Sequence, residues 1–206
     1  MKIDIQDIKF WMDAIRNSED RDRTLESFWG GQLLSKKWLI ENLEKIVTKI
    51  TNANIVIHGG WNGVLSSMLF NSNIGIQNIV SVDIDPRVKD TALTINKRYE
   101  IEGRFKAVVS DMCKYDYDER ADIVINTSCE HITNEQYNQW LDKIPKNSLI
   151  VLQSNNYFDL DEHINCHDTL KSFEESSKIN IVYSNQLELP HVNYKRFMLI
   201  GNKDGR

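Results

Sequence analysis

The stretch Ile55–Leu65, IVIHGGWNGVL, consists of an apolar run, a glycine turn and a second apolar run. A short apolar run bounded by turn residues is typical of a strand buried on both faces. Glycine lets the backbone turn sharply and lets a ligand approach it closely. A helix expected from about Asn62 would offer free N–H groups at the same place. The segment therefore predicts a strand–turn–helix unit with a binding site at the turn.

The rest of the chain continues this alternation. Asp85 and Pro86 are typical of a helix start, and Thr133-Asn-Glu-Gln reads as a capping box. Strands separated by helical crossovers require a parallel sheet covered on both faces. Two late apolar runs with no helical period between them predict a closing hairpin. The expected strands are residues 54–58, 78–84, 105–109, 122–126, 148–153, 179–183 and 196–200, and the expected core helices are residues 62–71, 86–100, from 133 onward, and 168–177.

The predicted fold is thus α/β: a doubly wound, mostly parallel seven-stranded sheet that ends in an antiparallel β-hairpin, with helices on both faces. Two helices are expected before the first strand. One covers Ile8–Ile15, and the other runs to Ile50 with Ser35 as its N-cap. With no repeat or linker in the sequence, we predict a single domain over 1–206, made of a helical extension (1–52) and a core (53–206).

Composition narrows the function. The net charge is −5, and the 25 Lys and Arg residues are spread along the chain, so nucleic acid is a possible but not a favoured partner. Three scattered cysteines and a charged N-terminal segment predict a reduced, cytoplasmic protein. No apolar run approaches the ~20 residues that span a bilayer, so no membrane association is expected. Nothing in the sequence indicates an oligomeric state.

Ligands of a doubly wound sheet bind at the carboxyl ends of its strands. Asp83 lies 20 residues beyond Gly63, where a carboxylate can accept hydrogen bonds from both hydroxyls of a ribose. Asp111 and Met112 follow the third strand and offer a carboxylate and an apolar side chain, which suit an adenine amino group and ring. With the glycine turn, these residues would hold an adenosine.

These motifs resemble those of the class I S-adenosylmethionine-dependent methyltransferases, over roughly residues 54–201. IHGGWNG is similar to their glycine-rich motif, SVDIDP to their ribose-binding motif, SDM to their adenine-contacting motif, and ADIVINTSCEHI to the strand beside the methyl donor. Upstream, GGQLL is similar to a Gly-Gln segment of the ribosomal RNA adenine dimethylases. The resemblance implies a Rossmann-like fold, methyl transfer and S-adenosyl-L-methionine as the cofactor. The implied cofactor-binding residues are Gln32, Gly59, Gly60, Trp61, Gly63, Asp83, Ile84, Asp111, Met112 and Asn126.

Two positions depart from the family pattern. The family usually has an acidic residue at the end of the first strand and a glycine in the middle of the loop, where this chain has Ile57 and Trp61. Trp61 either packs over the first core helix or walls the methionine portion of the donor, where an indole beside a sulfonium would gain a cation–π interaction.

The acceptor is expected beyond the fourth strand. Glu130 or His131 could serve there as a general base, although the same segment could instead cap the next helix. The polar loop after the fifth strand predicts acceptor recognition by Asn155, Tyr157 and His163. Metal binding is not predicted, because the histidine and cysteine ligands of residues 163–167 include an adjacent pair that suits one tetrahedral centre poorly.

The acceptor class follows from a missing signature. Residues 126–129, NTSC, lack the Asn-Pro-Pro-Tyr or Asp-Pro-Pro-Tyr sequence of the family's exocyclic-amine nucleic-acid methylases, so a small molecule or a protein side chain is favoured. Three alternatives stay open. They are a nicotinamide dehydrogenase, for which a GxGxxG is lacking, a transferase that uses another part of the same donor, and a methyltransferase-like interaction module without activity.

Overall fold

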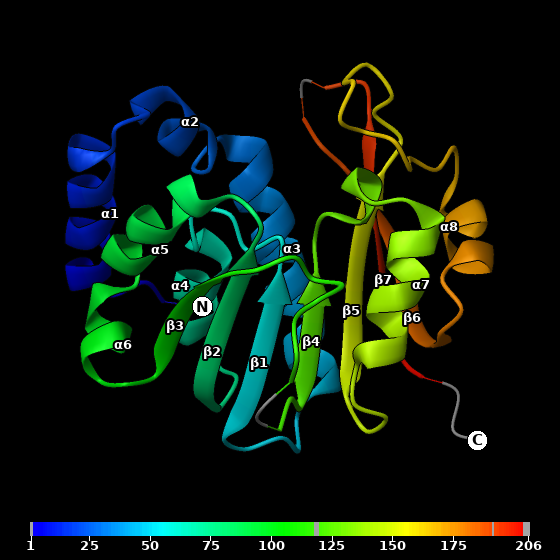
Figure 1. Cartoon of the computed structure of the whole chain (residues 1–206), viewed down its shortest axis with the longest axis horizontal. Coiled ribbons are helices and arrows are strands. Elements are labelled where there is room, and N and C mark those ends of the chain that lie inside the picture. Colours follow the sequence, from blue (N-terminus) through cyan, green and yellow to red (C-terminus); the bar gives the residue numbers. More distant parts are fainter. Residues whose placement is uncertain (1, 118–119, 191, 204–206) are drawn as a thin grey trace.

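The computed structural model describes residues 2–117, 120–190 and 192–203. Within these residues a seven-stranded sheet forms the centre of the molecule, in the order β3-β2-β1-β4-β5-β7-β6 (Figure 1). Its strands are β1 (Ala53–His58), β2 (Ile76–Asp83), β3 (Phe105–Val109), β4 (Ile123–Asn126), β5 (Leu149–Asn155), β6 (Asn180–Glu188) and β7 (Lys195–Asn202).

The first five strands are parallel, whereas β7 is antiparallel to both β5 and β6. The predicted α/β fold with its closing antiparallel hairpin is therefore confirmed. Strand order reverses between β1 and β4, since the chain first builds outward through β2 and β3 and then returns to the other side of β1. In sheets of this kind the crevice at such a reversal is the usual ligand site.

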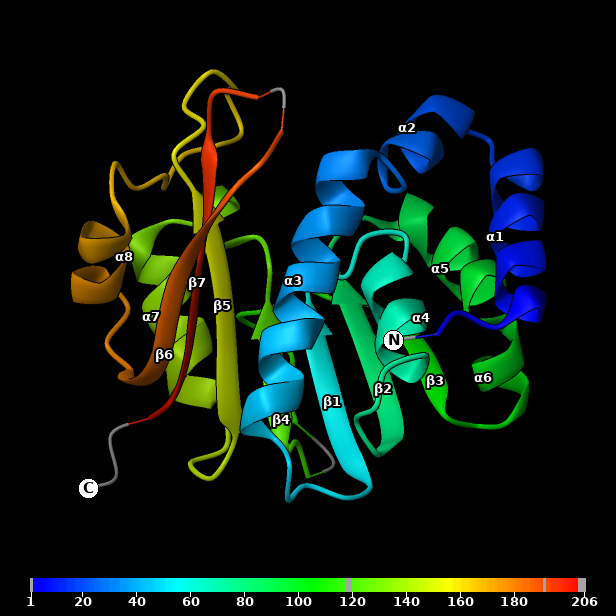
Figure 2. The same cartoon turned by 180° about the vertical axis from the view of Figure 1, so that it is seen from behind.

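Helices cover both faces of the sheet (Figures 1 and 2). Alternating side chains of the central strands point to opposite faces, so Ile55 and Ile57 pack with one set of helices and Val56 with the other. The first set is α1 (Ile5–Asn17), α3 (Gly30–Ile46), α4 (Val64–Phe70), α5 (Lys89–Ile95) and α6 (Lys97–Ile101); the second is α7 (Asn134–Lys143) and α8 (Leu170–Ser176). Among the described residues, no helix has the length and apolar character needed to cross a membrane.

The N-terminal part differs from the sequence prediction. A further short helix, α2 (Arg21–Glu26), lies between α1 and α3, so three helices precede β1 in the part of the chain that the structure describes. The expectation that Ser35 caps the next helix is wrong, because α3 already begins at Gly30. Ser35 is buried inside α3, and its hydroxyl donates to Gln153 Oε1 on β5 (3.3 Å). The Trp29 indole packs directly over Gly31. A Cβ at this position would lie 2.1 Å from a ring carbon, so the contact requires glycine in the first turn of α3.

Elsewhere the local signals hold. Asp85 accepts from the backbone N–H of Arg87 at the start of η1 (Pro86–Val88), and Thr133 forms a capping box with Gln136 at the start of α7. The helix expected over 86–100 is divided into η1, α5 and α6. The break falls at Asn96, whose buried side-chain amide donates to the Gly63 and Ala92 carbonyls.

Candidate functional site

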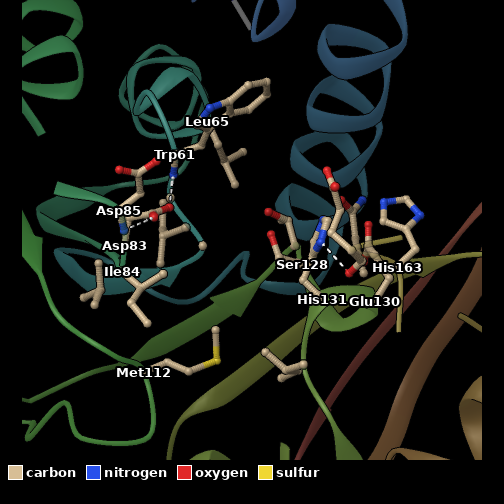
Figure 3. Close-up of a pocket in the computed structure, with 18 of the residues that line it drawn as sticks. Trp61, Leu65, Asp83, Ile84, Asp85, Met112, Ser128, Glu130, His131 and His163 are labelled. Atoms are coloured by element: carbon tan, nitrogen blue, oxygen red, sulfur yellow. Dashed lines mark hydrogen bonds between the residues drawn. The ribbon is translucent and has the colours of Figure 1, made fainter. Parts of the chain in front are cut away.

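A cavity of about 710 Å³ opens at the carboxyl ends of the strands, at the reversal of strand order. Its walls come from the glycine turn after β1, the ends of β2 and β3, η2 (Cys129–His131), α3, the loop at 160–163, and β7. Figure 3 shows two groups of side chains on opposite sides of it. The sequence-predicted residues that line it are Gln32, Gly59, Gly60, Trp61, Asp83, Ile84, Asp111, Met112, Glu130, His131 and His163.

At one end of the cavity, the Asp83 carboxylate is fixed by two backbone groups. Its Oδ2 accepts from the N–H of Trp61 (2.8 Å), and its Oδ1 accepts from the N–H of Asp85 (3.0 Å). Each carboxylate oxygen has a further lone pair with which to accept from a ligand hydroxyl. Ile84, directly after β2, is 70% exposed and faces this end together with Met112, so apolar surface lies next to the carboxylate.

The glycine turn has the backbone shape that the sequence predicts. Gly63 has a φ of +73° and stands just before α4, and a Cβ at Gly60 would lie 1.9 Å from Ser81 Oγ. Trp61 also has a positive φ, +47°, although it carries a side chain. Its indole lies beside Leu65 at the cavity wall (Figure 3). Gly63 itself does not line the cavity and serves the turn.

At the other end, Glu130 is almost completely buried and takes part in an ion pair. Its Oε1 accepts from Arg196 Nη1 (3.0 Å) and from Asn155 Nδ2 (2.7 Å), while Arg196 Nη2 donates to the Thr127 carbonyl (3.0 Å). Among the described residues, no group donates to Glu130 Oε2. Because Thr133 caps α7, neither Glu130 nor His131 serves as that helix cap.

Two histidines lie beside Glu130, as Figure 3 shows. The rings of His131 and His163 meet edge to face with centroids 4.7 Å apart. Their Nδ1 atoms lie 3.1 Å from the Glu162 carbonyl and 2.6 Å from the Tyr157 carbonyl, respectively. A carbonyl only accepts, so each Nδ1 is the donor in its contact, and in the neutral form of the ring the lone pair then belongs to Nε2.

Three predicted residues lie behind the wall rather than on it. Asn155 is buried and orients Glu130. The ring of Tyr157 stacks on Tyr194 with centroids 5.0 Å apart. Asn126 is fully buried at the end of β4, where it accepts from the backbone N–H of Ser128 (2.9 Å) and donates to Met112 Sδ (3.7 Å).

Sequence reasoning missed three cations of the cavity: Arg23, Lys36 and Arg196. Arg23, on α2, donates from Nη1 to Asp85 Oδ2 (2.7 Å) and so ties the N-terminal helices to the rim. Lys36, on α3, donates to Gln32 Oε1 (2.8 Å). Desolvation, with a smaller contribution from the charge of Arg196, lowers the pKa of Lys36 to about 7. The Arg23 and Arg87 guanidiniums hold the pKa of Asp85 well below its usual range, Arg87 having the larger effect.

No protein-family model and no curated protein matches the chain. Solved structures do match. The N-methyltransferase NodS from Bradyrhizobium japonicum WM9 superimposes with a TM-score of 0.63 at 12% identity, covering 82% of this chain and 97% of that one. The chain has the fold of the class I S-adenosylmethionine-dependent methyltransferases.

Two further structures share this methyltransferase fold. The geranyl diphosphate C-methyltransferase from Streptomyces coelicolor A3(2), solved with Mg²⁺, a substrate thiolo analogue and S-adenosyl-L-homocysteine, has a TM-score of 0.62 at 10% identity and covers 84% of this chain and 76% of that one. The small RNA methyltransferase HEN1 has a TM-score of 0.63 at 16% identity and covers 82% of this chain and 25% of that one. At these identities the likeness is one of fold.

Proposed function

We propose that this protein transfers a methyl group from S-adenosyl-L-methionine to an acceptor bound beside Glu130 and His131. The observation that carries the proposal is the Asp83 carboxylate at the end of β2, fixed by the backbone N–H groups of Trp61 and Asp85 and set next to the exposed side chain of Ile84. A carboxylate can accept hydrogen bonds from the ribose hydroxyls, and the apolar surface beside it can contact the adenine.

The donor would lie along the cavity from Asp83 toward α3. Its ribose hydroxyls would donate to Asp83. Its adenine ring would lie against Ile84 and Met112, and the adenine amino group would donate to Asp111. The methionine end of the donor would then approach Gln32 and Lys36. There its carboxylate would meet the Lys36 side chain, which a hydrogen bond to Gln32 holds in place. Trp61 would wall the same portion of the donor.

Little covalent chemistry is required of the protein, because the donor's sulfonium already makes methyl transfer favourable. The site has to hold the nucleophile in line with the methyl group, exclude water and accept a proton from an acceptor that is not yet deprotonated. His131 is suited to accept that proton, since its Nδ1 faces a carbonyl and its Nε2 keeps a lone pair. Glu130 is the other candidate base, and it would accept the proton on Oε2, the oxygen without a hydrogen-bond partner among the described residues.

A small molecule or a protein side chain is the favoured acceptor. The acceptor end holds a few polar side chains around one buried ion pair, and the net charge of −5 does not favour a phosphate backbone. Methyltransferases of this fold named above act on both small molecules and RNA, so nucleic acid remains the second candidate.

The donor site is tested by calorimetric titration of the chain with S-adenosylmethionine and with S-adenosylhomocysteine. We expect micromolar binding that falls at least tenfold in Asp83→Asn, a change that keeps the side-chain shape but removes the charge. Asp90→Asn, at an exposed position on α5, is the matched control. If the folded wild-type protein gives no heat with either ligand, the proposal fails and the interaction-module interpretation takes its place.

A further inference from the structure

The acceptor end of the cavity contains a cluster of possible metal-ligating side chains, and this cluster includes both candidate bases of the proposed methyl transfer. Glu130, His131 and His163 each present a ligand atom, and these atoms all lie within 4.8 Å of one another. All three residues line the cavity. They come from two separate segments, η2 and the loop after β5, so the fold and not sequence proximity brings His163 to the other two.

The second observation is the unpaired oxygen of Glu130. The residue is 2% exposed, and its Oε1 is used by Arg196 and Asn155, whereas its Oε2 has no hydrogen-bond partner among the described residues. A buried carboxylate oxygen without a donor is costly, and a bound cation would remove that cost. The Arg196 and Asn155 contacts also fix the carboxylate, so its free oxygen is held in place on the cavity wall.

The third observation is the state of the two imidazoles. Both Nδ1 atoms face backbone carbonyls, at 3.1 Å for His131 and 2.6 Å for His163. This contact fixes the tautomer that leaves Nε2 as a lone-pair donor, and it is the usual support behind a metal-bound histidine. Ligand atoms that are each ~2.1 Å from one ion lie roughly 3–4 Å apart. Side-chain rotations that move the three ligand atoms by about 1 Å would therefore bring them to coordination distance.

We infer that Glu130, His131 and His163 bind a divalent first-row transition ion such as Zn²⁺ or Mn²⁺. Two imidazoles and one carboxylate suit such ions, whereas Mg²⁺ prefers oxygen ligands only. The positive charge of Arg196 opposes the binding of a cation nearby, but Arg196 contacts the other oxygen of Glu130. The loop that carries His163 also carries Asp159, Asp161 and Glu162, whose negative charges favour a cation. The sequence alone predicts no metal, because the ligands that it places together, at 163–167, are not those that the fold brings together.

Three protein ligands leave open positions on the ion, on the side of the cavity. If the proposed methyl transfer is correct, an acceptor oxygen would bind there and lose its proton more readily, because a bound cation lowers the pKa of a coordinated hydroxyl. With the ion bound, His131 and Glu130 would act as its ligands and not as the base. That role rests on the proposed function. The binding of the ion does not.

The test is calorimetric titration of the chelator-treated full chain with Zn²⁺, Mn²⁺ and Mg²⁺, without any methyl donor. We expect one ion of Zn²⁺ or Mn²⁺ per chain at micromolar concentration or below, and no Mg²⁺ binding in the same range. His131→Asn and His163→Asn keep an N–H donor but lack Nε2, and each should weaken binding at least tenfold. Glu130→Gln should do the same, with thermal unfolding confirming that each variant is folded.

His167→Asn is the matched control, since this nearby histidine lies outside the cluster and should bind the ion like the wild type. The inference is overturned if the wild type binds no stoichiometric Zn²⁺ or Mn²⁺, if Mg²⁺ binds equally well, or if His131→Asn and His163→Asn bind as the wild type does. A failure of donor binding in the earlier titration would leave this result standing, because the ion is measured alone.

Discussion

The backbone N–H of Trp61 donates to the carboxylate of Asp83 across 2.8 Å, and it does so from a left-handed backbone conformation. The bond needs only the backbone, so the side chain at position 61 is free to vary without breaking it. A side chain at positive φ is strained by about 1 kcal/mol or more, which glycine avoids. The indole lines the cavity, so a contact with a bound donor is the role that we test for it.

Trp61→Gly should separate these roles. Relief of the strained φ and the greater freedom of glycine in the unfolded chain nearly offset each other, so we expect the change in the free energy of unfolding to report mainly the lost packing of the indole. Donor affinity should fall about twofold to thirtyfold, because the cation–π contact with the sulfonium, ~0.5–2 kcal/mol, is lost. Urea unfolding and donor calorimetry measure the two effects. Unchanged affinity would mean that Trp61 is a packing residue only.

The Arg23–Asp85 ion pair should retard the release of donor. Arg23→Gln frees α2 from the rim, and we expect donor affinity to fall about two- to fivefold, the effect of an ion pair worth ~0.5–1 kcal/mol, mainly through faster dissociation in stopped-flow experiments. Arg87→Gln is the control, since Arg87 pairs with the same Asp85 oxygen but lies outside the cavity. Equal effects of the two substitutions would contradict a role for α2.

Donor binding should be coupled to a proton at Lys36. In the free protein its pKa is about 7, and a bound carboxylate beside it would raise that pKa. Binding near pH 8 should thus take up close to one proton, and affinity should decrease as the pH rises above about 7. The uptake is measured from calorimetric enthalpies in two buffers of different ionisation enthalpy. Lys36→Met should abolish it and Lys37→Met, on the exposed side of α3, should not.

Acid stability should depend on His58. Burial lowers the pKa of this side chain to about 3, while Nε2 contacts the Tyr117 hydroxyl (2.8 Å). The unfolded chain, with a histidine pKa near ~6.5, takes up the proton first as the pH falls, so stability is lost below pH ~6.5, by about 2 kcal/mol at pH 5. Above pH 7 the group makes no difference. His58→Phe should reduce the slope of unfolding free energy against pH over this range, and parallel slopes would contradict the assignment.

The sequence predicts the sheet because its central strands are buried on both faces and therefore appear as apolar runs. It also predicts the glycine turn, Asp83 and Asp111, since each lies at or just beyond the carboxyl end of such a strand. The sequence also predicts the helix caps at Asp85 and Thr133, because capping depends on residues within the same turn.

The rest depends on contacts between distant segments. Arg23 and Lys36 belong to helices whose polar faces look like any solvated surface, and Arg196 begins the second strand of the predicted closing hairpin. Nothing near Arg23 and Arg196 in the sequence indicates that they meet Asp85 and Glu130. Lys36 and Gln32 form an i,i+4 pair, but only the packing of α3 on the sheet places that pair at the cavity. Ser35 shows the converse, because a residue typical of a helix start is used as a buried hydrogen-bond donor once α3 packs on β5.

The pairing of Glu130 with Arg196 also bears on the order in which the cavity is assembled during synthesis. The side chains expected to hold the donor lie between Gln32 and Met112, so a nascent chain that has been made only that far already contains them. The opposite wall needs Arg196 on β7, which is inserted between β5 and β6. A ribosome-bound chain would thus contain the donor-end side chains first, and the buried carboxylate would gain its partner only after nearly all of the sheet had been translated.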